Sequence, residues 1–123
     1  MAQAVEEVKA FTDSMSIEGY RRSGVFVDIT NQAEEVQNKY ANGELRKEIT
    51  FLDNEKLDYF VLPVQPGEIY KITTFHSLYI SGYYFTNGAD IVIEKCPHTD
   101  LGGVMKFVGE ITVPDGATML YVN

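Results

Sequence analysis

One short segment gathers residue types that bind metals or act as nucleophiles. Cys96, His98 and Asp100 occupy alternate positions in EKCPHTDLGG, so in an extended segment they share one face. A structural zinc site needs four ligands, usually two pairs of Cys or His, and the only other histidine is His76. We therefore expect no metal and no other cofactor, and we interpret the segment as a loop.

The same residues do not make a nucleophilic site. A Cys–His pair also needs a third, orienting group and an oxyanion site, and the spacing of Cys96 and His98 supplies neither. The simpler interpretation of Cys96 is a small residue packed at the end of a strand, beside Pro97. We expect no catalytic residue here.

The 18 Asp and Glu residues are numerous enough to give carboxylate pairs by chance. Glycoside hydrolysis needs two carboxyl groups facing each other across a cleft, and nothing marks Glu68, Asp90 or Glu110 for that role, since they fall at predicted turns and on polar strand faces. Asp53-Asn54-Glu55 with Asp58 forms an acidic turn that fails the EF-hand pattern. A lone calcium ion there stays open as a minor alternative to a solvated surface.

Aromatic residues are concentrated in one predicted strand and the segment before it. Alternate side chains of a strand point to opposite faces, so either Tyr83 with Phe85, or Tyr84, faces the core. The other set faces outward unless a second layer covers it. Exposed tyrosine is typical of interfaces and of sugar-binding sites, and subunit contact is the alternative use. The candidate ligand-binding residues are His76, Tyr79, Tyr83 and Tyr84.

Residues 2–15 are predicted to form the one short helix. Val5, Val8, Phe11 and Met15 recur at helical spacing and form an apolar stripe. The stripe either covers the sheet as a lid or ends an oligomer stalk. We predict that these four residues form the interface of a homo-oligomer, most simply a trimer. Residues 1–20, which include this helix, are accordingly assigned to an N-terminal stalk or lid, and residues 21–123 to a β-sandwich domain.

From residue 24 onward the hydrophobic period changes to two, as in Val25, Val27 and Ile29, which indicates strands with one buried face. Turn signals such as Asn42-Gly43 and Asn87-Gly88 separate these runs. We expect Pro63 at a sheet edge or bend. The predicted strands are 25–30, 45–51, 59–64, 69–74, 78–85, 89–94, 106–113 and 118–123, with turns also at Pro66-Gly67 and Pro114-Asp115-Gly116.

About eight short strands without intervening helices predict a mainly β protein, an antiparallel β-sandwich. Segment 31–41 is either a helix capped by Asn31 and Glu34 or an extended loop.

Length, composition and charge limit the classes of partner that the chain is expected to bind. A chain of 123 residues is the size of one domain, and its single cysteine rules out an internal disulfide. The net charge of −8 disfavours nucleic acid and anionic membrane surfaces. The start MAQAVEEVKA has the pattern of neither a signal peptide nor a membrane anchor.

The stretch from Asn38 to Asn123 resembles a jelly-roll-like β-sandwich module of phage tail-fibre and baseplate proteins, also found beside bacterial surface hydrolases. The residues that carry the resemblance are Val64-Gln65-Pro66-Gly67-Glu68-Ile69-Tyr70, Asn87-Gly88 and the segment 111–117. The resemblance implies a module that binds glycans or assembles in trimers at a tail tip. The chain departs from it in having no Trp to stack on sugar rings, although tyrosine can do so too.

Three functions follow as expectations. The first is a non-enzymatic receptor-binding domain on a virion tail or cell surface that contacts a cell-surface glycan. The second is a structural module that assembles a trimer or docks on a neighbouring tail protein. The third is an accessory domain of a surface hydrolase. An exposed aromatic groove favours the first, a large apolar subunit interface the second, and a monomer without a groove the third.

Overall fold

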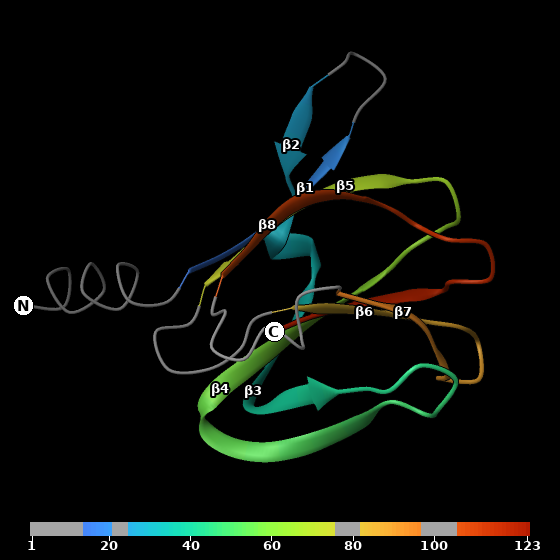
Figure 1. Ribbon diagram of the computed structural model, residues 1–123. Helices are drawn as coiled ribbons and strands as arrows, with labels where there is room; N and C mark the ends of the chain where they lie inside the picture. Colours follow the sequence, from blue (N-terminus) through green and yellow to red (C-terminus); the bar gives the residue numbers. More distant parts are fainter. Residues whose placement is uncertain (1–13, 21–24, 76–81, 97–105) are drawn as a thin grey trace, which may run out of the picture.

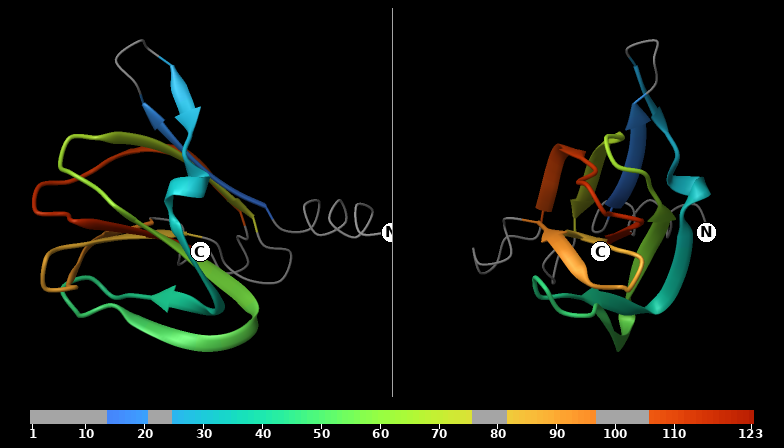
Figure 2. Two further views of the ribbon diagram at one scale, coloured as in Figure 1. Left: turned by 180° about the vertical axis from the view of Figure 1, so that it is seen from behind. Right: turned by 90° about the vertical axis from the view of Figure 1, so that its right-hand side faces the viewer.

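A computed structural model describes residues 14–20, 25–75, 82–96 and 106–123 of the chain, and they form two antiparallel sheets (Figure 1). One sheet has the strand order β2-β1-β5-β8, and the other has the order β3-β4-β9-β6-β7. The strands are β1 (Ser14–Tyr20), β2 (Phe26–Asp28), β3 (Glu34–Asn42), β4 (Thr50–Pro63), β5 (Ile69–Phe75), β6 (Tyr83–Thr86), β7 (Val92–Lys95), β8 (Lys106–Thr112) and β9 (Met119–Val122). Figure 2 shows the sheets as two layers. The mainly β, sandwich-like architecture predicted from the sequence is confirmed.

The N-terminal helix prediction is wrong where it can be compared with the structure. Ser14 and Met15, its last two residues, lie in β1, and Met15 pairs with Thr74 of β5. Met15, Ile17 and Gly19 follow the period of a strand, and that pairing with β5 decides their conformation. Residues 2–13 of the predicted helix lie outside the described residues. Within the described ranges the only helical element is the 3-10 turn η1 (Thr30–Gln32).

Residues 14–20 are therefore part of the four-stranded sheet rather than of a separate N-terminal element. Segment 31–41, for which a helix and an extended loop were both open, forms the end of η1 and most of β3. The predicted strand 45–51 is also shifted, because residues 44–48 form the turn between β3 and β4.

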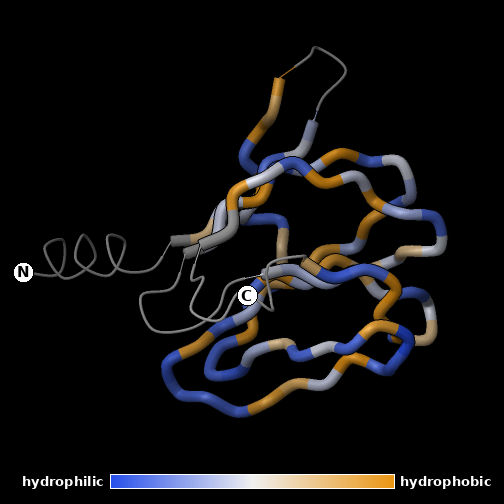
Figure 3. The backbone as a smooth tube through the Cα atoms, in the orientation of Figure 1, coloured by the Kyte–Doolittle hydropathy of each residue, from blue (hydrophilic) through white to orange (hydrophobic). Residues whose placement is uncertain are grey.

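The main core lies between the two sheets. Its fully buried side chains, all 0% exposed, are Ile17 of β1, Ile72 of β5, Phe85 of β6, Leu120 and Val122 of β9, and Cys96 just after β7. Figure 3 shows hydrophobic residues recurring along the strands of both layers. On the other side of the four-stranded sheet, Val108, Glu110 and Thr112 of β8 are exposed, as the period-two pattern predicts.

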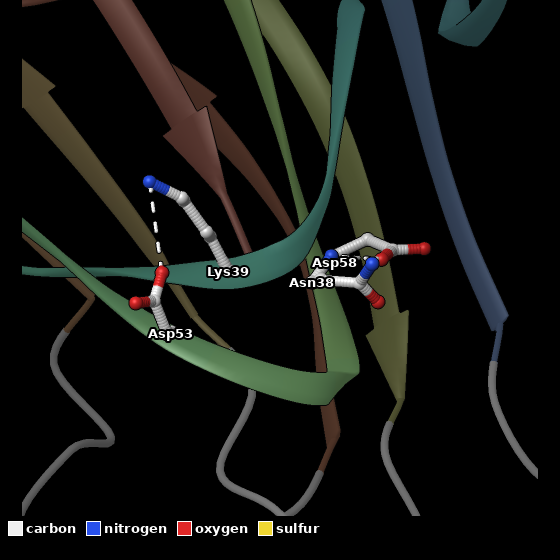
Figure 4. Close-up of polar contacts among 4 residues, drawn as sticks. All are labelled: Asn38, Lys39, Asp53 and Asp58. Atoms are coloured by element: carbon white, nitrogen blue, oxygen red, sulfur yellow. Dashed lines mark hydrogen bonds and ion pairs between the residues drawn. The ribbon is translucent and has the colours of Figure 1, made fainter.

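The hairpin made by β3 and β4 bends sharply near its middle. Gln37 pairs with Asp58 and Lys39 pairs with Asp53, so residues 54–57 of β4 lie opposite the single residue Asn38. Asn38 has φ of 64°, and a bulge of this kind kinks a strand pair. Figure 4 shows the two strands curving at this point.

Beyond the bulge, the far half of the hairpin covers the outer face of the five-stranded sheet (Figure 1). The backbone N–H of Arg46 donates to Val92 O over 2.8 Å, and the Val92 N–H donates to Lys47 O over 2.9 Å. These bonds attach the hairpin's turn to β7. The covered residues, which we name the second core, are Ala41, Ile49, Tyr59, Val61, Tyr84, Val92 and Tyr121.

Asn123 joins parts of the chain that are distant in sequence. Its side-chain Oδ1 accepts the Ala41 N–H over 2.9 Å, and its Nδ2 donates to Ala41 O over 2.8 Å. Its backbone carbonyl accepts a hydrogen bond from the Thr74 hydroxyl. Asn123 therefore links the end of β9 both to the folded-back hairpin and to β5 of the other sheet.

Two turn predictions have different outcomes. The Pro66-Gly67 turn is confirmed: the Glu68 N–H donates to Gln65 O over 3.2 Å, and Gly67 has φ of 87°, as the third position of a type II turn requires. The Asn87-Gly88 turn is longer than predicted, since the positive φ falls on Asp90 at 62°. The Asn87 carboxamide there accepts the N–H groups of Ala89 and Ile91.

Pro63 is the last residue of β4 and pairs with Met119 of β9. The pairing of β4 with β3 ends earlier, at Val61. Pro63 therefore lies at the end of an interior strand, beyond the β3 pairing, where its missing N–H breaks no bond to β3.

Buried tyrosines make the fold sensitive to alkali. Burial, with smaller contributions from Glu94 and Cys96, raises the pKa of Tyr83 from 10.0 to about 12. Burial also raises the pKa values of Tyr59, Tyr84 and Tyr121. The folded state thus keeps phenol protons that the unfolded chain loses above pH 10, so the stabilisation is complete below pH 10 and is lost as the pH rises toward about 12.

We expect the free energy of unfolding, measured by urea titration, to fall across this range of pH. Tyr83→Phe removes one titrating group and is expected to make the fall shallower. An identical fall in the variant and the parent protein would show that Tyr83 does not contribute.

Candidate ligand-binding groove

The tyrosines predicted as a ligand platform are buried. Tyr83 is 5% exposed and faces the main core with Phe85, and Tyr84 is 8% exposed and lies in the second core. The folded-back hairpin supplies the covering layer that the sequence left open. Tyr83 and Tyr84 are therefore enclosed in the two cores and do not form an exposed platform. His76 and Tyr79 lie outside the described residues.

Of the predicted oligomer interface, only Met15 lies among the described residues. Met15 is half-buried and packs against the main core, so it is not part of an exposed stripe. Val5, Val8 and Phe11 lie outside the described residues, and their role stays a prediction.

Cys96 is the small packed residue that the sequence suggested. It is 0% exposed in the main core, and its N–H donates to Tyr83 O over 2.9 Å. His98 and Asp100 lie outside the described residues. In the described part of the chain, no three His, Cys, Asp or Glu side chains are grouped so that they could hold a metal ion.

The acidic segment around Asp53 is not a turn but the bulge of β4 (Figure 4). Asp58 Oδ1 accepts the Asn38 N–H over 2.9 Å, and Asp53 Oδ1 lies 3.6 Å from Lys39 Nζ. Asp58 therefore ties β4 to β3 at the bulge, and Asp53 adds an exposed ion pair beside it.

A groove of about 890 Å³ lies where three distant segments meet. Gly19 and Tyr20 at the end of β1 form the first segment of its lining. Ile29 after β2 and Gln32 in η1 form the second. The third runs from the end of β4 through the β4–β5 turn to the start of β5 and contributes Leu62, Pro63, Pro66, Gly67, Glu68, Ile69 and Tyr70.

Hydrogen bonds fix the one charged side chain of this groove lining. Glu68 Oε1 accepts the Gln65 N–H over 2.6 Å and the Tyr70 hydroxyl over 3.0 Å. The carboxylate is thereby tied both to the Pro66-Gly67 turn and to β5. Both bonds use Oε1, so Oε2 can accept a hydrogen bond from a ligand.

Tyr20 supplies an accessible aromatic side chain. It is 45% exposed, and its ring packs edge-to-face on Phe26 of β2 at 5.5 Å. A ring held in this way loses little freedom when it stacks on a flat apolar surface. The groove thus joins an aromatic ring, a carboxylate and the Gln32 amide, a combination suited to a polar ligand with apolar faces.

The sequence did not point to Tyr20 because the residue follows the predicted helix and stands outside the aromatic run. The one available signal was Gly19, a small residue beside an aromatic one. Its significance depends on Ile29, whose Cδ1 would lie 3.3 Å from a Cβ at position 19.

Comparisons of the chain with protein-family models, curated proteins and solved structures found no match. Within the described residues, no helix combines the length and the apolar character needed to cross a membrane.

Proposed function

We propose that the chain is a non-enzymatic binding module of the jelly-roll-like type, working as a receptor-binding domain of a phage tail fibre, and that its ligand is a cell-surface glycan. The observation that carries the proposal is the groove, whose lining contains both the exposed Tyr20 and the fixed carboxylate of Glu68. Aromatic rings pack on the apolar faces of sugars, and a few polar groups set the orientation of a ligand. The location on a virion tail or cell surface is part of the proposal.

The proposal is tested with a glycan array, followed by calorimetry with the best ligand. Tyr20→Ala is expected to raise the dissociation constant at least about tenfold, as truncation of a central aromatic residue does. Tyr40→Ala is the matched control, because Tyr40 is a half-exposed tyrosine in the far half of the folded-back hairpin. Equal affinity of both variants, or no binding on the array, would contradict the proposal.

A structural assembly module is the second candidate. Tyr20, Val25 and Val27 are 45%, 53% and 42% exposed. They lie at the end of β1, just before β2 and within β2, and this part of the sheet extends beyond the rest (Figure 1). An apolar projection is suited to contact with another protein. A trimer in solution that binds no glycan would favour this candidate. A monomer without ligand would leave the accessory domain of a surface hydrolase as the better explanation.

A further inference from the structure

The sheet edges differ in how open they are. In the five-stranded sheet, β3 is interrupted by the bulge at Asn38, and Val92 of β7 is bonded to the β3–β4 turn. In the four-stranded sheet, β2 has only three residues, whereas β8 has seven. Sheet edges are usually blunted by proline, by bulges or by short length. β8 has no proline, and its register with β5 is uninterrupted from Thr112 to Lys106.

The hydrogen bonds at the end of β8 show which backbone groups the open edge presents. The Val113 N–H donates to Glu68 O over 2.8 Å, toward β5. Successive residues of an antiparallel strand direct their backbone groups to opposite neighbours. The N–H and C=O groups of Val108, Glu110 and Thr112 therefore point away from β5. Among the described residues, β8 pairs with β5 alone.

We propose that this edge pairs with the same edge of a second copy of the chain, giving a two-fold dimer with one continuous sheet. In an antiparallel pair centred on Val108, the two Val108 residues face each other and supply hydrogen bonds to each other. Val108 is 50% exposed, so the contact covers an apolar side chain that water otherwise surrounds.

Charge favours this register over the one centred on Glu110. Centring on Val108 brings position 106, a lysine, opposite position 110, a glutamate, twice by symmetry. Centring on Glu110 instead sets like charges opposite each other, which is destabilising. In the register centred on Val108 the edge is thus complementary to itself in charge, which favours a second copy of the chain as its partner.

The first test measures the mass of the full chain by analytical ultracentrifugation over a range of concentrations. We expect a monomer–dimer equilibrium. Val108→Lys sets two lysines face to face and is expected to give a monomer with an unchanged circular dichroism spectrum. Leu52→Lys on β4 is the matched control, because Leu52 is 41% exposed and far from this edge in sequence, and it should leave the dimer intact.

A charge-swap experiment tests the register. Lys106→Glu and Glu110→Lys each set like charges opposite each other and are expected to weaken the homodimer at least about tenfold. Mixing the two variants restores opposite charges at every pair, so a heterodimer should form. A monomeric parent protein, a trimer, a dimer unaffected by Val108→Lys, or failure of the mixed variants to associate would overturn the proposal.

Discussion

Replacing Phe85 by alanine is expected to lower the free energy of unfolding by about 3–5 kcal/mol. The side chain is 0% exposed, and its ring packs edge-to-face on Tyr83 at 5.6 Å. Phe85 pairs with Leu120 on one side and with Glu94 on the other, so it sits inside the five-stranded sheet. These neighbours leave little room for the core to collapse around a shortened side chain. Because natural domains are stable by only about 5–15 kcal/mol, the loss is a large fraction of the total.

Phe51→Ala is the matched control for this prediction. Phe51 is 38% exposed and stacks on Tyr59 at 4.9 Å over the outer side of the second core. Its removal gives up ring contact but opens no enclosed cavity, so we expect a cost of about 1–2 kcal/mol. Urea titrations of both variants measure the difference. Equal costs would mean that the main core is not the better packed of the two.

Gly43→Ala is expected to destabilise the protein by about 1–3 kcal/mol, the usual cost of overpacking. A Cβ at this position would lie 2.7 Å from Val92 Cγ2 and 3.1 Å from Tyr84 Cδ1. Both partners belong to the second core, and Val92 is 0% exposed. The new methyl group can be accommodated only if the folded-back hairpin moves away from β7. We therefore expect the loss of stability to be accompanied by faster hydrogen exchange at the Arg46 and Val92 amides.

Gly88→Ala provides the comparison, since a Cβ there meets nothing within 4 Å. We expect its free energy of unfolding to be unchanged or slightly higher, because alanine restricts the unfolded chain. If Gly43→Ala were as well tolerated as Gly88→Ala, the hairpin would not be packed as described.

The period of the hydrophobic residues predicted the strand class correctly, because burial on one face of a sheet is a local requirement. The same rule gave a wrong prediction at Met15, because the apolar residues of the predicted helix run directly into those of β1 in the sequence. Ser14–Tyr20 alternates as a strand should, but only its pairing with β5 distinguishes it from the end of a helix.

The second core could not be predicted from the sequence. Tyr84 had two possible environments, and the outcome depended on a bulge at Asn38 that folds one hairpin over the sheet. No local sequence pattern encodes the position of this hairpin over the sheet. The groove has the same origin, since Tyr20, Leu62 and Glu68 meet only after both sheets have formed.

The position of β9 in the sheet affects how the chain folds during its synthesis. Met119–Val122 lies between β4 and β6, and Asn123 contacts Ala41 across 82 positions of the sequence. On the ribosome, β4 and β6 emerge well before the strand that joins them, and both wait with an unpaired edge. Contacts of such long range slow folding, and waiting edges invite association between nascent chains. A chain that ends before residue 119 is therefore expected to aggregate, whereas the chain that includes Met119–Asn123 is not.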